Sequence, residues 1–297
     1  MRISSHQVLD TSLANISDAF SRLDSAQQKL SSGIQINAPS DNPVGIQQVL
    51  EFKARIAETD QYSKTLGQSK GYLATTETAL SSISTLTRQV RSLAVQAANE
   101  TLDENTLPNL AKQVQDAINQ VGSIGNTTYG QQYIFGGQKT GSAPMQGSGS
   151  TFAYSGGTQA GGNGAITLDI GRSESITVNV SGDQVLTPLL ATLTKVRDDI
   201  SVGASAEISK TDLAQLDVQL SNIVNTRADI GSKLARIDSE TQRNEVTKLN
   251  YTQLMSTIQD TNVPQAVIAL QSASTAYQAA LQSTAKSFQI SLLDYLK

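Results

Sequence analysis

Two long stretches of this chain lack interior proline and repeat apolar residues at helical spacing. The first runs from Pro43 to Asn99, and its only interior glycines are Gly45, Gly67 and Gly71. At 1.5 Å per residue, a helix of roughly 57 residues would extend for about 85 Å. That length exceeds the diameter of a compact domain, so the sequence predicts an elongated helical element even if the glycines interrupt it.

The second stretch runs from Thr211 to Asp260 and is interrupted only by Gly231. Seven apolar residues form its main seam at steps of three, four or seven: Leu213, Leu216, Leu220, Ile223, Ile230, Leu234 and Ile237. Its roughly 50 residues would reach about 75 Å as a helix. Two long predicted helices on either side of a middle segment of different composition predict an antiparallel pair of helices. The expected fold is mainly α, an elongated rod of long antiparallel helices with a small β-rich insertion.

A shorter helix is predicted before the first long one. Its apolar residues follow a heptad pattern, typical of a helix that packs along a neighbour: Leu9, Leu13, Ile16, Phe20, Leu23 and Leu30. Gly33 can end this helix in the left-handed conformation. Asn42 and Pro43 then form a helix start, with asparagine as the cap and proline in the first turn.

The last helix is predicted to follow Pro264 and carries a similar stripe. The candidate contact residues of this stripe are Val267, Leu270, Tyr277, Leu281, Phe288, Leu292, Leu293 and Leu296. Residues 264–297 contain only three charged side chains, those of Lys286, Asp294 and Lys297. A surface helix normally shows a charged face to water. We therefore expect both terminal helices to pack between neighbours, as an assembly interface.

The middle of the chain has a different composition. Ten of the 21 glycines lie in residues 141–182, where apolar and polar residues alternate over 166–170 and again over 176–180. This alternation predicts two half-buried strands, and Thr187 and Pro188 predict the start of the next helix. The expected division is a terminal assembly domain (1–38 and 262–297), a helical rod domain (39–138 and 183–261) and a β-rich insertion domain (139–182).

The composition excludes several kinds of chemistry. There is no cysteine and the only histidine is His6, which removes thiolate metal sites, cysteine nucleophiles and multi-histidine metal sites. Gly137-Gln138-Lys139-Thr140 lacks the glycine that a phosphate loop needs before its lysine. A net charge of −4 provides no basic surface for nucleic acid or anionic lipid. We expect no enzyme activity, no cofactor, no metal, and neither a nucleic-acid nor a membrane partner.

Both ends of the chain resemble the flagellin superfamily. Arg2-Ile3-Ser4-Ser5 and the segment from Leu30 to Gly45 are similar to its N-terminal signature, and Leu270 to Leu296 is similar to its C-terminal counterpart. The resemblance covers about residues 1–137 and 205–297. Tyr133-Ile134-Phe135-Gly136-Gly137, Asp41-Asn42-Pro43-Val44-Gly45 and the Leu292-Leu293-Asp294-Tyr295-Leu296 ending resemble members that join the flagellar hook to the filament.

The resemblance implies a structural subunit rather than an enzyme. Its partners would be other copies of itself, a neighbouring hook-associated protein on the hook side, flagellin-side subunits and a flagellar export chaperone that holds the C-terminal helix. It also implies a secreted component of the extracellular bacterial flagellum, exported without a cleaved signal peptide. Two alternatives stay open: a flagellin that builds the filament itself, and a surface-binding module that presents the β-rich insertion.

Overall fold

The structure, a computed structural model, describes residues 2–99, 106–147, 152–157 and 164–295, excluding the side chains of residues 2–6, 8, 9 and 287–295. The chain divides into two compact units. Unit 1 consists of Met1–Glu58 and Val246–Lys297, and unit 2 consists of Thr59–Glu245. The three-part division expected from the sequence stays a prediction, because these units group the segments differently.

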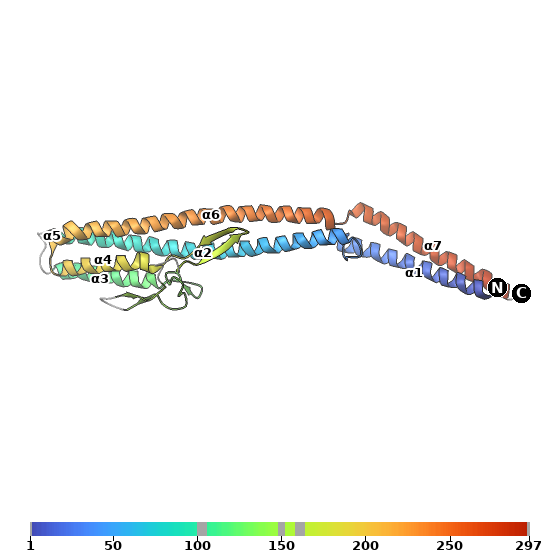
Figure 1. Cartoon of the computed structure of the whole chain (residues 1–297), viewed down its shortest axis with the longest axis horizontal. Coiled ribbons are helices and arrows are strands. Elements are labelled where there is room, and N and C mark those ends of the chain that lie inside the picture. Colours follow the sequence, from blue (N-terminus) through green and yellow to red (C-terminus); the bar gives the residue numbers. More distant parts are fainter. Residues whose placement is uncertain (1, 100–105, 148–151, 158–163, 296–297) are drawn as a thin grey trace. The chain divides into compact units, whose positions relative to one another are not determined.

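Helices account for most of the described chain, which confirms the mainly α class (Figure 1). They are α1 (Arg2–Ser32), α2 (Pro43–Ala97), α3 (Thr106–Gly125), α4 (Gly182–Ser201), the short α5 (Ser205–Glu207), the π-helical turn η2 (Ile208–Asp212), α6 (Leu213–Gln259) and α7 (Val263–Tyr295). The strands form three antiparallel pairs: β1 (Thr128–Tyr129) with β2 (Gln132–Tyr133), β3 (Met145–Gln146) with β4 (Ala153–Tyr154), and β5 (Thr167–Gly171) with β6 (Glu174–Thr177).

The expected signals at the start of α2 are confirmed. Gly33 has a φ of +68°, the left-handed conformation that ends α1. The Asn42 side-chain oxygen accepts a hydrogen bond from the Gly45 backbone N–H at 2.9 Å, so asparagine caps the helix and Pro43 is its first residue. α2 then continues through Gly67 and Gly71 without a break. A Cβ added at Gly71 would lie 2.3 Å from the Tyr129 hydroxyl, so this glycine makes room for the β1–β2 hairpin.

The predicted start of α4 at Thr187 and Pro188 is wrong. The helix begins five residues earlier, at Gly182, and Pro188 lies inside it. The start is fixed from outside the helix, because the Gly182 N–H donates to the Phe135 carbonyl at 3.1 Å. Proline sacrifices one helical hydrogen bond at most in this position, and that loss is tolerated where tertiary contacts define the helix.

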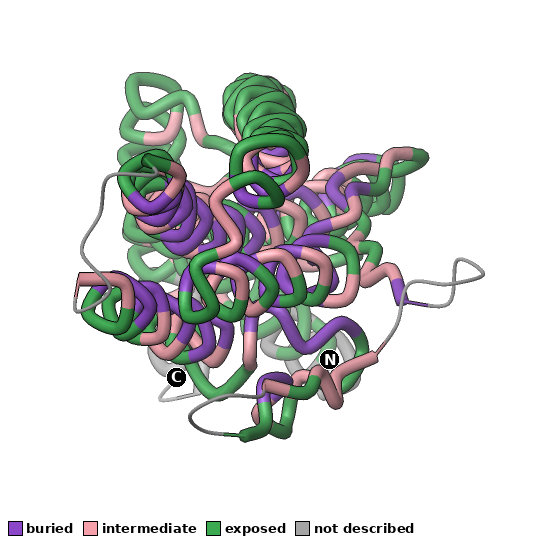
Figure 2. The backbone as a smooth tube through the Cα atoms, turned by 90° about the vertical axis from the view of Figure 1, so that its left-hand side faces the viewer, coloured by how far each residue is buried: buried purple, intermediate pink, exposed green. Residues whose placement is uncertain are grey.

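The hydrophobic core lies in unit 2. Here α3 packs closely along α4, and both pack with the parts of α2 and α6 that belong to this unit (Figure 1). The buried sides of these helices face one another (purple in Figure 2). Ion pairs show that α2 and α6 run antiparallel within unit 2: Lys70–Asp238 at 2.7 Å, Glu77–Arg227 at 3.0 Å and Arg91–Asp217 at 2.6 Å.

The segment after the β1–β2 hairpin anchors the insertion to this core. Ile134 and Phe135 are fully buried. The Tyr72 hydroxyl of α2 donates to the Ile134 carbonyl at 2.9 Å, and the Tyr154 hydroxyl of β4 donates to the Phe135 carbonyl at 2.9 Å. Gly137 follows with a φ of +61°, and a Cβ there would lie 2.3 Å from the Gly157 carbonyl oxygen. Only glycine fits this position without displacing the backbone that crosses it.

The alternating residues of the insertion form the expected hairpin of β5 and β6. Leu168 lies opposite Ile176, and the buried Ile170 and Ile176 belong to the unit 2 core. The pair β3–β4 has no comparable alternation in the sequence. It is held in part by Asn126, whose side chain exchanges two 2.9 Å hydrogen bonds with the Met145 backbone.

Hydroxyl groups along α2 bond back to the helix itself. At least nine serine or threonine side chains donate to the carbonyl four residues earlier: Ser63, Thr65, Ser69, Thr75, Thr76, Thr78, Ser82, Thr85 and Thr87. These bonds satisfy the hydroxyls without water or a neighbouring chain. These hydroxyl groups of α2 therefore need no hydrogen-bond partner outside the helix.

Candidate assembly interface

Unit 1 is built on the antiparallel pairing of α1 and α7. The segment that follows α1 and the segment that precedes α7 are joined by two backbone hydrogen bonds. The Gln35 N–H donates to the Gln259 carbonyl at 2.7 Å, and the Thr261 N–H donates to the Gly33 carbonyl at 2.8 Å. Asn262 then caps α7, because its side-chain oxygen accepts a hydrogen bond from the Gln265 backbone N–H. The two helices pack along each other from this point (Figure 1).

Small residues at heptad spacing form much of the seam between α1 and α7. Half-buried residues recur every seven positions in each helix: Ser12, Ala19 and Ala26 in α1, and Ala266, Ala273 and Ala280 in α7. Small side chains allow two helix backbones to approach closely. The stripes of large apolar residues did not predict this seam. The signal that could have predicted it is the repeat of small residues, mostly alanine, at every seventh position.

The candidate contact residues divide into two groups. Those half-buried within unit 1 are Ile16, Leu23, Leu30, Leu270 and Tyr277. Those exposed to solvent are Leu13, Phe20, Val267 and Leu281. The side chains of Leu9, Phe288, Leu292 and Leu293, and residue Leu296, lie outside the described residues. The heptad residues of each helix therefore lie on two faces. One face packs against the other helix of unit 1, and the second face is exposed to solvent.

One aromatic contact spans the boundary between these two faces. The rings of Phe20 and Tyr277 lie 5.8 Å apart between centroids, in a tilted arrangement. Phe20 nevertheless keeps 56% of its surface exposed. We regard Leu13, Phe20, Val267, Leu281 and the neighbouring exposed Val263 and Ile268 as the outer stripe of unit 1.

Unit 1 buries very little apolar surface. Among its described residues only Ile36 and Val49 are apolar and buried, whereas large apolar side chains are exposed on all four of its helical segments. An isolated helix pair with so small a core is marginally stable in water. Exposed apolar patches of this kind mark surfaces that contact other proteins.

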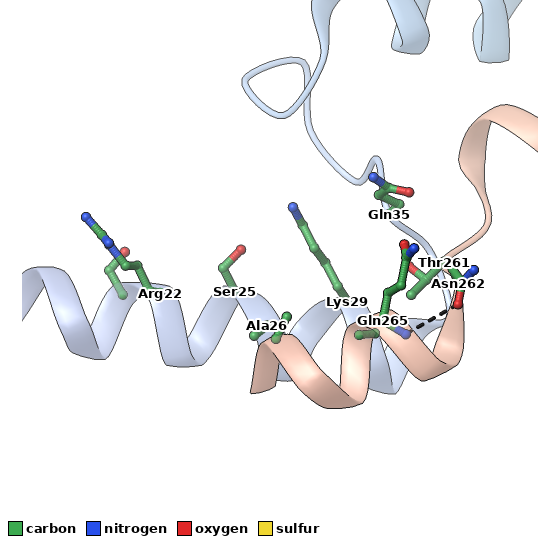
Figure 3. A pocket seen from close by; sticks show the side chains of 11 residues that line it. Arg22, Ser25, Ala26, Lys29, Gln35, Thr261, Asn262 and Gln265 are labelled. Carbon is green, nitrogen blue, oxygen red and sulfur yellow. Dashed lines mark hydrogen bonds between the residues drawn. The ribbon is translucent and has the colours of Figure 1, made fainter. Parts of the chain in front are cut away.

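A polar groove opens where α1, α7 and the segment after α1 meet (Figure 3). It has a volume of about 510 Å³ and is lined by Ser21, Arg22, Ser25, Ala26, Lys29, Gln35, Thr261, Asn262, Gln265, Ala266 and Ala269. Arg22, Ser25 and Lys29 project from the same side of α1 (Figure 3). Arg22 and Lys29 are the two charged residues in this lining, and both are cations.

The loop after α1 is organised by Asp41. Its carboxylate accepts hydrogen bonds from the Asn37 and Ala38 backbone N–H groups, each at 3.0 Å. These bonds, first that from Ala38 and then that from Asn37, lower the pKa of the Asp41 carboxyl, and the positive charge of Lys29 lowers it further. Asp41 therefore caps backbone groups of the loop, as Asn42 caps the start of α2.

Metal sites and membrane-spanning helices do not occur in the part of the chain that the structure describes. Within it, no group of three or more histidine, cysteine, aspartate or glutamate residues is arranged to hold a metal ion. Nor does any helix in the described ranges have the length and apolar character needed to cross a membrane.

Comparisons with known proteins place the chain. Residues 3–140 match the family model of the bacterial flagellin N-terminal helical region. Flagellar hook-associated protein 3 of Escherichia coli (strain K12) is 25% identical over 316 residues, which cover 97% of this chain and 96% of that protein. Phase 1 flagellin of Salmonella naestved is 31% identical, but over only 38% of this chain and 23% of that protein.

A solved structure shares the fold. A crystal structure of flagellar hook-associated protein 3 from Legionella pneumophila superposes with a TM-score of 0.64 at 15% identity, covering 71% of this chain and 98% of that one. The phase 1 flagellin match covers 38% of this chain, whereas the match to hook-associated protein 3 covers 97% of it. Over nearly its full length the chain is therefore similar to flagellar hook-associated protein 3, and its residues 3–140 match the flagellin N-terminal family model.

Proposed function

We propose that this chain is a structural subunit of the bacterial flagellum that joins the hook to the filament. The observation that carries the proposal is the near full-length similarity to hook-associated protein 3. The exposed outer stripe of unit 1 supports it, because a unit with only two buried apolar residues among its described residues needs neighbours. A structural role requires no catalytic group, so the predicted absence of enzyme activity fits this proposal.

The terminal helices are proposed as the assembly interface. Ile16, Leu23, Leu30, Leu270 and Tyr277 hold α1 against α7 and preserve the shape of the pair. The outer stripe would contact other copies of the chain, a hook-associated protein on the hook side and flagellin-side subunits. Before assembly, an export chaperone would cover the C-terminal helix. We further propose secretion through the flagellar export apparatus without a cleaved signal peptide.

Deletion of the gene tests the proposal in cells. A strain without this chain is expected to make hooks that carry no filament and to release flagellin monomers into the medium. Electron microscopy of the hooks and an immunoblot of the medium measure the two results. Intact hooks with attached filaments would contradict the proposal, and bare hooks with no flagellin released would instead support the flagellin alternative.

Charges placed in the outer stripe are expected to block assembly without unfolding the chain. Leu13→Asp and Leu281→Asp each introduce a carboxylate where a neighbour would bury it, at residues that are 57% and 42% exposed in the free chain. We expect the melting temperature to change by no more than about 2 °C, because surface substitutions usually cost little. Incorporation into hook particles should be lost. Normal incorporation of both variants would refute the role of the stripe.

Removal of the terminal helices is expected to leave unit 2 folded. Every residue of its hydrophobic core lies between Leu66 and Ile237, so deletion of residues 1–38 or 262–297 takes nothing from that core. Such a chain should show a cooperative thermal transition by circular dichroism and fail to enter hook particles. A gradual, non-cooperative transition would contradict the separation of the assembly and rod domains.

The surface-binding alternative concerns the β-rich insertion at residues 139–182. Its β5–β6 hairpin is fixed to α6 through Glu174, which pairs with Arg243 at 3.1 Å and lies 3.6 Å from Arg236. The hairpin therefore contacts α6 through Glu174 and the unit 2 core through Ile170 and Ile176. A glycan array probed with the full chain would test this alternative, and specific binding would favour it.

A further inference from the structure

The polar groove at the start of α7 differs from the outer stripe in its chemistry. Its lining combines the cations of Arg22 and Lys29 with hydroxyl and amide groups from α1, α7 and the connecting segments. The Thr261 hydroxyl is buried and has no hydrogen-bond partner among the described residues. Hydrogen-bond donors and positive charge converging in one groove favour a carboxylate as the bound group.

The two cations are only weakly neutralised within the chain. Arg22 pairs with Asp18 at 2.8 Å, but both side chains are mostly exposed, and exposed pairs of this kind contribute little. Lys29 lies 3.9 Å from Asp41, whose other oxygen is already bonded to two backbone N–H groups. The first turn of α7 adds the partial positive charge of a helix N-terminus to the same groove. The positive charge of the groove is therefore only partly offset by Asp18 and Asp41.

Asp10 is the matching group on the same chain. Among the described side chains of unit 1, it is the carboxylate with no hydrogen bond or ion pair, whereas Asp18, Asp24, Asp41, Glu51, Glu58 and Asp260 all have partners. Asp10 is exposed on α1. It precedes Lys29 by 19 residues, which places it about 28 Å along the helix and about 100° around it. It cannot reach the groove of its own chain.

We propose that Asp10 of one copy binds in the groove of a neighbouring copy, between Arg22 and Lys29. This contact rests on the proposed function, because it assumes that copies of the chain stand side by side. One copy presents the acid and the next presents the groove, so the contact is head-to-tail and can repeat around a ring. The flanking outer stripe excludes water from the pair, and a shielded pair is stronger than an exposed one. The ion pair fixes the axial offset between neighbours, which apolar contacts alone leave loose.

Charge exchange between the two positions tests the proposal in the full chain. Lys29→Glu alone and Asp10→Lys alone each place like charges in contact, and each is expected to reduce the number of cells with attached filaments by about tenfold or more. The combined variant Asp10→Lys with Lys29→Glu restores opposite charges and should recover filament attachment. Lys53→Glu is the matched control, because Lys53 is exposed in the same unit without an ion pair, and it should behave as the wild type.

Cysteine pairing identifies the neighbour directly, since the natural chain contains no cysteine. Hook particles from a strain with both Asp10→Cys and Lys29→Cys should give a ladder of disulfide-linked multimers on a non-reducing gel, and each single variant should not. Wild-type attachment with Lys29→Glu, failure of the combined variant to recover, or absence of the ladder would overturn the contact between copies. The proposed function would fail separately, by absence of the wild-type chain from hook particles.

Discussion

Lys195→Met is expected to lower the free energy of unfolding of unit 2 by about 3 kcal/mol, because it leaves the buried carboxylate of Asp212 without its counter-charge. The Lys195 ammonium bonds to Asp212 at 2.8 Å, to Asp199 at 2.6 Å and to Glu207 at 3.3 Å. Asp212 is 1% exposed and lies in the η2 turn at the start of α6. The value is at the low end for a broken buried pair because Lys195 itself is partly exposed and water can enter.

This loss is expected to depend on pH. Burial already raises the pKa of the Asp212 carboxyl, and only Lys195 opposes that increase. Without the lysine the pKa rises further above the value in the unfolded chain, so the folded state binds the proton more tightly. Stability is then retained at low pH and falls as pH rises through the folded-state pKa. The variant should therefore lose most stability at neutral pH and approach the wild type near pH ~4.

Urea unfolding followed by circular dichroism at both pH values measures the effect. Lys70→Met is a suitable control, because Lys70 and its partner Asp238 are each more than half exposed, and exposed pairs contribute about 1 kcal/mol or less. Equal losses for the two variants, or a Lys195→Met loss that is the same at both pH values, would show that Asp212 does not depend on this lysine.

Phe135→Ala is expected to destabilise unit 2 by about 3–5 kcal/mol, the cost of removing a large side chain from a closed core. Phe135 is completely buried, and its carbonyl accepts hydrogen bonds from the Tyr154 hydroxyl and the Gly182 N–H. A cavity at this position is expected to weaken both the attachment of the insertion to the core and the hydrogen bond at the start of α4. Thermal unfolding together with near-UV circular dichroism of the tyrosines measures both.

Phe20→Ala provides the matched control, since it removes the same side chain from a position that is 56% exposed in unit 1. It should leave the main unfolding transition unchanged. If Phe135→Ala shifted that transition no more than Phe20→Ala does, the Tyr133–Gly137 segment would be a surface turn rather than the anchor of the insertion.

Periodicity and capping residues predicted most of the helices, because those signals are local. Asn42 and Gly33 placed two helix ends correctly, and the alternation around Ile170 and Ile176 predicted the β5–β6 hairpin. The start of α4 depends on a hydrogen bond from Gly182 to Phe135, 47 residues away in sequence, which no local pattern records. The η2 turn similarly depends on Lys195, which lies in another helix.

The candidate interface was predictable in part. The heptads identified the correct helices but did not show which side of each helix faces the partner within the chain. Ala19 and Ala26 form that side, and Leu13 and Phe20 lie outside it. Large apolar residues indicate burial in general, whereas the choice between burial within a chain and burial between chains depends on small residues that let backbones approach. The polar groove depends on residues from three segments, so the sequence alone did not predict it.

The hydroxyls that bond back to α2 have a mechanical consequence. Of these residues, Thr78, Ser82 and Thr85 are exposed on one side of the helix. Because their hydroxyls already donate to the helix, this side can exchange water for a neighbouring chain at little cost. Back-bonded serine and threonine additionally make a helix easier to bend. The exposed side of α2 around Thr78, Ser82 and Thr85 can therefore contact a neighbouring chain at little desolvation cost, and the helix can bend to follow it.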